Sequence, residues 1–268
     1  MGNIERYDIR INITMRVIIN ADDCGKNEQV NCHIKKAIEA GKLTSTTIMA
    51  NMSDVEGALQ LYEEYYKQIS FGIHLNLTEG EPLLKSKTLL DFGYYSVQDG
   101  KIVFDGTKAE SFRYKRLPRD IKAEIYKELA AQIKLLQEGG TILSHIDSHH
   151  HIHTCFSLIE VIAQLSKDFN LYKVRRIRNY VPRLMSFYGR QAWATLSHLY
   201  NSQYIMTDFF AIFKEFFEKE RISKLKPDSS IELMIHPGHY MESYQKEEQM
   251  MLDMTYPDYF ELINYNEL

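Results

Sequence analysis

Short apolar or β-branched runs alternate along this 268-residue chain with longer stretches of helical periodicity. Such alternation is expected when parallel strands are joined by crossover helices, because each parallel strand needs a long return connection. Seven such runs come close to a closed barrel, so we predict an α/β fold with about seven parallel strands. The expected strands are Arg16–Asn20, Ser45–Asn51, Ile69–Leu77, Ile142–Asp147, Lys173–Arg178, Gln203–Met206 and Ile231–Ile235.

The clearest helix is expected from about Pro118 to Glu138. Proline suits a first helical turn, and the apolar residues that follow recur every three or four positions on one face. Gly139-Gly140 ends the pattern. Further helices are expected near Asn27–Ala40, Val55–Lys67, Leu158–Lys167, Arg183–Tyr200 and Asp208–Glu218.

The length suits one large domain, which we expect over residues 15–268. Residues 1–14 are polar and form an expected loosely ordered extension, with Met15 as the expected natural start. The alternation of strands and helices breaks at about 79–117, where glycines and prolines punctuate short strand-like pieces. An excursion of that length beside a site is typical of a lid or rim.

Composition narrows the classes of partner. A net charge of -4 gives no reason to expect nucleic acid or an anionic membrane, so we expect a small-molecule substrate. No apolar run approaches the roughly 20 residues needed to cross a bilayer. The three cysteines form no Cys-x-x-Cys pair, which suits a reducing compartment, and the cytoplasm is the expected location. The oligomeric state stays open, with a homodimer as one alternative.

The densest chemical signal is a group of four histidines within residues 149–153. Neutral imidazole is the commonest protein ligand for a divalent metal, which favours metal binding over a solvated loop or an expression tag. As a strand, the chain would place His145, Asp147 and His149 on one face, whereas a helical turn would bring His149 and His153 together. Only some of these side chains can reach one ion.

Three further polar groups follow predicted strands, at the edge where α/β folds place their active sites. Asp22 and Asp23 are adjacent, and a buried carboxylate pair is costly unless a cation or proton resolves the repulsion; the alternative is a helix N-cap with turn residues. His74 ends the third strand and His236 follows the last. A single histidine on an apolar strand is more often a structural residue.

Taken together, a carboxylate and two or three histidines from separate strand ends form a mixed nitrogen and oxygen set. That set suits Zn²⁺ or a related first-row ion with open positions for water and substrate. A second carboxylate beside the ligand could take a proton from water activated by the metal, and a distant histidine could protonate the leaving group.

The sequence resembles the YdjC-like carbohydrate deacetylases, the family that includes the bacterial chitooligosaccharide deacetylases. The resemblance implies a distorted, TIM-barrel-like (β/α) barrel that binds one divalent ion, Zn²⁺ or Mg²⁺, and removes acetyl groups from N-acetylated amino sugars. The stretches that carry it run in family order over nearly the whole chain. They are Asn20–Gly25, Thr44–Asn51, Gly72–Thr78, Asp147–His153 and Glu232–Gly238.

Carried over by position, the resemblance implies that Asp23, His74 and His149 are the metal ligands. It also implies that Asp22 is the general base and His236 the general acid. The two aspartate roles follow from similarity to the wider polysaccharide deacetylases, in which a paired-aspartate motif divides base and ligand duties.

Substrate contacts are expected from Arg178 and His153. Arg175, Arg176 and Arg178 lie in the second half of one predicted strand, and one of them could hold a sugar hydroxyl, a phosphate or the acidic base. A solvated basic turn is the alternative, and Arg178, at the strand end, is the preferred candidate.

Cys24 departs from the family, which often carries phenylalanine there. Its thiol could pack as a small apolar group or tune the site through redox chemistry. Two rival functions stay open: another metal-dependent barrel hydrolase, such as a phosphoesterase or amidohydrolase, and a non-catalytic sugar-binding or metal-binding protein. The presence of both Asp22 and His236 argues against the second rival, because binding alone needs no acid and base pair.

Overall fold

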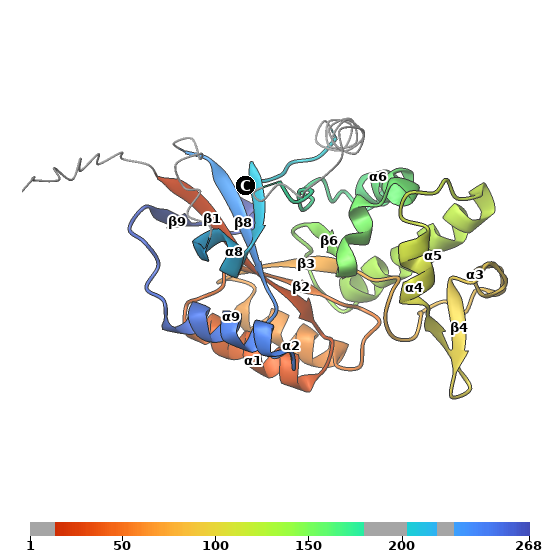
Figure 1. The fold of residues 1–268 in the computed structure, drawn as a ribbon, viewed down its shortest axis with the longest axis horizontal. Coiled ribbons are helices and arrows are strands. Elements are labelled where there is room, and N and C mark those ends of the chain that lie inside the picture. The colour runs from red at the N-terminus through yellow and green to blue at the C-terminus, as the bar shows by residue number, and fades with distance from the viewer. Residues whose placement is uncertain (1–13, 180–202, 219–227) are drawn as a thin grey trace, which may run out of the picture.

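The computed structural model describes residues 14–179, 203–218 and 228–268. Over this part of the chain the main sheet has seven strands, all parallel, in the order β6-β3-β2-β1-β8-β7, with β9 beside β1 (Figure 1). The sheet curves as a half-barrel, which confirms the predicted α/β class. The strands are β1 (Met15–Cys24), β2 (Ser45–Ile48), β3 (Ser70–Leu75), β6 (Ile146–Ser148), β7 (Phe209–Ile212), β8 (Ser230–Ile235) and β9 (Phe260–Leu262).

Helices return the chain between the strands, as the periodicity predicted. Figure 1 shows α1 (Glu28–Glu39), α2 (Val55–Tyr65) and α9 (Glu242–Asp253) along one side of the sheet. The long helix α5 (Arg119–Glu138) packs against α6 (Ile159–Asp168). No helix in the described ranges is long and apolar enough to cross a membrane.

The sheet is covered on both faces, so its strands are apolar almost throughout rather than alternating. All residues of β3 and β8 are buried, and so are nine of the ten in β1. Both faces of a parallel sheet are usually buried in this way, because the crossover helices between its strands lie on those faces. The polar side chains that remain at the carboxyl ends of these strands are therefore exceptions that need partners.

Two predicted strands form only isolated bridges. Val174 pairs with Ile146, and Lys173 pairs with Ile205, so Lys173–Arg178 and Gln203–Met206 are wrong as strands. The ladder is lost after Val174, although the Arg175 N–H still donates to the Ile146 carbonyl over 2.9 Å. Beyond that point side chains replace backbone pairing: the Asn179 side-chain oxygen accepts a hydrogen bond from the N–H of Phe210 in β7.

The region from Asp208 to Glu218 begins as a strand, not as the helix that was predicted. β7 pairs in parallel with β8, and the Asp208 carboxylate accepts hydrogen bonds from both the N–H and the hydroxyl of Ser230. Helix α8 (Phe213–Glu218) starts only after that pairing ends. The sequence also missed α9 and β9. The predicted helix Arg183–Tyr200 and residues 1–13 of the predicted extension lie outside the described residues.

The excursion forms its own small layer beside the barrel (Figure 1). It contains α3 (Lys87–Phe92), an antiparallel hairpin of β4 (Tyr95–Gln98) and β5 (Lys101–Phe104), and α4 (Gly106–Ser111). Glu128 of α5 accepts hydrogen bonds from the Leu83 and Leu84 N–H groups, which ties its start to the barrel. After α4, the Arg113 side chain donates to the His150 carbonyl over 2.9 Å, so the excursion borders the histidine cluster.

Gly72 lies where β3 passes the ring of His145, which is itself stacked on Tyr265 at 3.5 Å between ring centroids. A Cβ at Gly72 would lie 2.5 Å from Cε1 of that buried ring. We therefore expect Gly72→Ala to lower the free energy of unfolding by about 1–3 kcal/mol in urea denaturation. The cost should shrink when His145→Ala opens the space, and an equal cost in both backgrounds would contradict this packing account.

Candidate functional site

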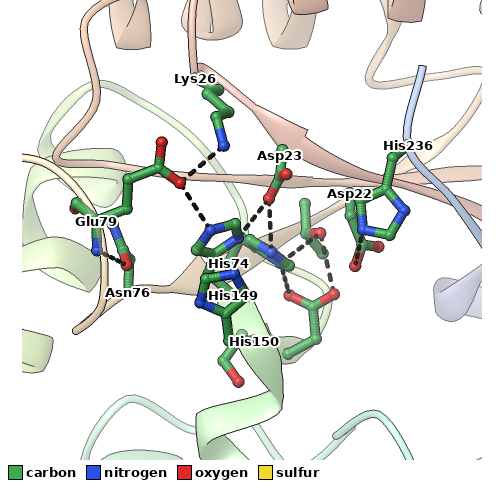
Figure 2. Close-up of polar contacts among 12 residues, drawn as sticks. Asp22, Asp23, Lys26, His74, Asn76, Glu79, His149, His150 and His236 are labelled. Carbon is green, nitrogen blue, oxygen red and sulfur yellow. Dashed lines mark hydrogen bonds and ion pairs between the residues drawn. The ribbon is translucent and has the colours of Figure 1, made fainter. Parts of the chain in front are cut away.

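The site begins with a bulge at the carboxyl end of β1. The pairing of β1 with β2 shifts register between Ala21 and Cys24, and Asp23 has a φ of 68°. Successive residues of a regular strand point to opposite faces, whereas a bulge re-aims a side chain. Both Asp22 and Asp23 consequently face the same group of histidines (Figure 2). Both side chains are almost completely buried.

Asp23 lies between two of the predicted ligands. Its Oδ1 is 3.0 Å from His74 Nε2 and 2.8 Å from His149 Nδ1. Together the three residues offer one ligand atom each, and all three atoms lie within 4.8 Å of one another. The structure therefore brings Asp23, His74 and His149 together in an arrangement that could hold a single metal ion, as Figure 2 shows.

A second carboxylate orients each of these histidines. Asp147 Oδ1 is 2.7 Å from His74 Nδ1, and Glu79 Oε2 is 2.9 Å from His149 Nε2. In metal sites such outer carboxylates fix the tautomer of a ligating histidine and raise its basicity. Burial lowers the pKa of His74, but Asp147 and Asp23 outweigh it and raise that pKa to about 10. Each ring therefore turns its other nitrogen toward Asp23.

Glu79 is a site residue that the sequence reasoning missed. The side-chain oxygen of Asn76 accepts hydrogen bonds from the N–H groups of Thr78 and Glu79, and its amide donates to the Glu79 carbonyl over 2.7 Å. Lys26 Nζ lies 2.7 Å from Glu79 Oε2. The bond to His149, despite partial burial, helps lower the Glu79 pKa to about 2. The only sequence signal was its place just after the third predicted strand.

Asp22 is held by a buried arginine. Arg175 has no exposed surface and donates to both oxygens of Asp22, over 2.6 and 2.7 Å. Its Nη1 also lies 2.8 Å from Asp147 Oδ2, and its Nε donates to Glu232 Oε1 over 2.8 Å. Burial alone would raise the pKa of Asp22, but the charge of Arg175 outweighs it and keeps that pKa below its ordinary value. Asp22 is therefore an ionised carboxylate at neutral pH.

A second group, Asp22, His74 and Asp147, also has ligand atoms within 4.8 Å of one another. Arg175 contacts both of its carboxylates, so the positive charge there is already supplied. A second cation would have to lie beside a buried guanidinium, which makes this group unsuited to a metal.

His236 lies on the other side of Asp22, with Nε2 3.9 Å from Asp22 Oδ2 (Figure 2). It follows β8 directly, and the ring of Tyr244 in α9 lies 4.7 Å from its own. Burial lowers the pKa of His236, and the attraction of Asp22 and Asp23 only partly offsets this. The structure thus brings the expected base and acid close to the Asp23 group.

The two residues expected to contact substrate are His153 and Arg178. His153 is completely buried, with Nδ1 bonded to the Ser148 hydroxyl. Arg178 is partly exposed and its guanidinium pairs with Glu215 in α8, while Arg175, not Arg178, reaches Asp22. Within the histidine cluster, φ angles of 51° at residue 150 and 54° at residue 151 interrupt any regular helical turn.

Known proteins match much of this sequence and share its fold. The family model described as YdjC-like protein matches residues 16–262. The chain belongs to the YdjC-like family. A carbohydrate deacetylase of Clostridium beijerinckii is 33% identical over 85% of this chain and 83% of its own length. One of Oceanobacillus iheyensis is 31% identical over 92% of this chain and all of its own length.

A solved structure shares the fold of this YdjC-like chain. The crystal structure of a proposed cellobiose-phosphate cleavage protein from Enterococcus faecalis superimposes with a TM-score of 0.72. The alignment covers 95% of this chain and 98% of the other, at 20% sequence identity. The likeness supports the half-barrel architecture and carries no statement about substrate.

Cys24 ends β1 beside these carboxylates. Its thiol is completely buried, and burial raises its pKa to about 12. Thiolate is the reactive form of cysteine, so this side chain is inert at neutral pH. The structure favours the packing role over redox tuning.

Arg175→Met should be strongly destabilising, because it leaves three buried carboxylates without their shared cation. We expect a loss of about 3–5 kcal/mol in the free energy of unfolding. In the wild type, the lowered Asp22 pKa stabilises the fold above the unfolded pKa of that group, and this contribution disappears as the pH falls through the folded pKa. In the variant, burial without the guanidinium should raise the pKa of Asp22 above its unfolded value, so this carboxyl takes up a proton as the pH falls toward 4. The deficit of the variant should therefore be largest at neutral pH, shrink toward pH 4 as that proton is bound, and shrink further below about pH 4 as the wild type loses its own contribution, in denaturation curves. A deficit that does not change with pH would contradict the account.

Proposed function

We propose that this protein is a metal-dependent carbohydrate deacetylase acting on N-acetylated amino sugars such as chitooligosaccharides. The observation that carries the proposal is the ionised Asp22, held by Arg175 between His236 and the group of Asp23, His74 and His149. Binding alone would need no such pair of acid and base. The names of the curated relatives support the same reaction.

In this proposal Asp23, His74 and His149 hold one divalent ion. Two imidazoles and a carboxylate fit Zn²⁺ or a related first-row ion, and the carboxylate also admits Mg²⁺. Asp23 Oδ2 supports the assignment, because it is buried and makes no hydrogen bond within the described residues. When bound, such an ion polarises the acetyl carbonyl and makes water more acidic.

Asp22 acts as the general base. It removes a proton from the attacking water as the water oxygen adds to the acetyl carbon. Arg175 keeps the carboxylate ionised and fixes both of its oxygens, so the base is ready before substrate arrives. The carboxylate is held by the protein rather than by solvent, which reduces reorganisation during the reaction.

His236 acts as the general acid. As imidazolium it gives its proton to the amide nitrogen while the C–N bond breaks, so that the products are acetate and a free amino sugar. An unprotonated amide nitrogen is too poor a leaving group, which is why the acid is needed. The pKa of His236 is lowered mainly by burial, and the ionised Asp22 beside it favours the protonated form.

Arg178 remains our candidate for a substrate contact, because its guanidinium is partly exposed. His153 could act only after a rearrangement, since it is completely buried. A cytoplasmic location and a homodimer remain predictions from the sequence.

The direct test is acetate release from N-acetylglucosamine oligomers by the purified protein. We expect release that a chelator abolishes and that added divalent metal restores. Release of phosphate from a sugar phosphate instead would favour a phosphoesterase, and tight sugar binding without turnover would favour a binding protein. Either result would overturn the proposal.

The proposed roles predict two classes of variant. Asp22→Asn should keep the bound metal and lose most of the turnover, at least about 100-fold, because it removes a general base. His74→Ala and His149→Ala should lose the ion itself. Metal content by atomic emission, measured beside kcat, separates the classes. Equal activity, or equal loss of metal, in all three variants would contradict these assignments.

A further inference from the structure

A third histidine faces Asp23 from a different part of the chain. His239 Nε2 lies 3.0 Å from Asp23 Oδ2, and only 14% of its side chain is exposed. The other oxygen of the same carboxylate faces His74 and His149. Nitrogens of three imidazoles therefore surround one carboxylate.

The turn before His239 is anchored in a way that directs this side chain. Gly238 has a φ of 75°, and a Cβ there would lie 2.9 Å from Val30 Cα in α1. The Gly238 N–H donates to Glu248 over 3.0 Å, and its carbonyl accepts from Gln29 over 2.8 Å. The turn is thus fixed to α1 and α9 by bonds to its own backbone.

The contact between His239 and Asp23 is short, but it is poorly aligned for a hydrogen bond. Although Asp23 Oδ2 and His239 Nε2 are close, neither atom makes a hydrogen bond of acceptable geometry within the described residues, and both atoms are buried. An unsatisfied buried polar atom costs about 1–3 kcal/mol. A cation bound by both of these facing atoms would satisfy them together.

We propose that His239 is a further protein ligand to the ion, giving a set of three histidines and one aspartate. This inference rests on the proposed metal site and extends it from two imidazoles to three. A set rich in imidazole selects first-row transition ions such as Zn²⁺ over Mg²⁺, which prefers oxygen ligands and keeps its waters. His239 would then determine which metal this chain uses.

Metal binding by the full-length protein tests this directly, without an activity assay. The chelator-treated protein is titrated with Zn²⁺ against a chromophoric competitor, with Mg²⁺ by calorimetry, and with Co²⁺ while its visible absorption is recorded. The variant His239→Gln keeps an amide that can hydrogen-bond to Asp23 but removes the imidazole ligand. His33→Gln is the matched control, because this histidine lies beside the same turn and its ring contacts Glu248 rather than Asp23.

Loss of a residue that only hydrogen-bonds to a metal ligand weakens metal binding by roughly 10–100-fold. We expect His239→Gln to weaken Zn²⁺ binding by more than this and to change the Co²⁺ spectrum. Its effect on Mg²⁺ binding should be much smaller. His33→Gln should match the wild type. A His239→Gln protein with an unchanged Co²⁺ spectrum, or with Zn²⁺ affinity within about 100-fold of wild type, overturns the ligand assignment. His74→Ala separates failure of the His239 assignment from failure of the proposed metal site. If His74→Ala also binds Zn²⁺ normally, the metal site itself is wrong.

Discussion

The interior of this half-barrel depends on one buried cation. Arg175 has no contact with solvent, and it neutralises carboxylates from three strands, Asp22, Asp147 and Glu232. Charges buried this deeply are tolerated only when they are paired and hydrogen-bonded. Glu232 is further bound by the hydroxyl of Tyr265, over 2.5 Å, so the end of the chain takes part in the same network. The arginine thus allows a parallel sheet with an apolar core to carry several ionised groups.

The same network connects the proposed base to a proposed ligand. Arg175 fixes Asp22 on one side and Asp147 on the other, and Asp147 in turn orients His74 toward Asp23. Because the two carboxylates share one cation, a change at either should alter the position of the other. The proposed metal ligands and acid–base groups are therefore not independent, and effects of substitutions within the network should be non-additive.

The sequence predicted the parts of the site that lie at strand ends, because burial on both faces makes parallel strands easy to find and their carboxyl ends meet at one edge. It favoured Arg178, at the predicted strand end, over Arg175. Strand pairing stops right after Val174, and Arg175 is the residue whose guanidinium reaches Asp22. Glu79 was missed because the Asn76 side chain, not a strand, sets its loop. β7 was read as the start of a helix because its apolar run is short, and only pairing with β8 decides its conformation.

The bulge at Asp23 explains how two adjacent residues can serve one site. A regular strand would turn Asp22 and Asp23 to opposite faces, one toward the site and one into the apolar layer. The left-handed conformation of Asp23 costs about 1–2 kcal/mol for a residue with a Cβ, although aspartate is among the residues that tolerate it best. Arg175 on one carboxylate and a cation among the histidines on the other would offset that cost. The proposed roles would give the backbone strain, the paired charges and the unsatisfied Oδ2 of Asp23 a single explanation: a strand end shaped to present the proposed base beside the proposed metal ligand.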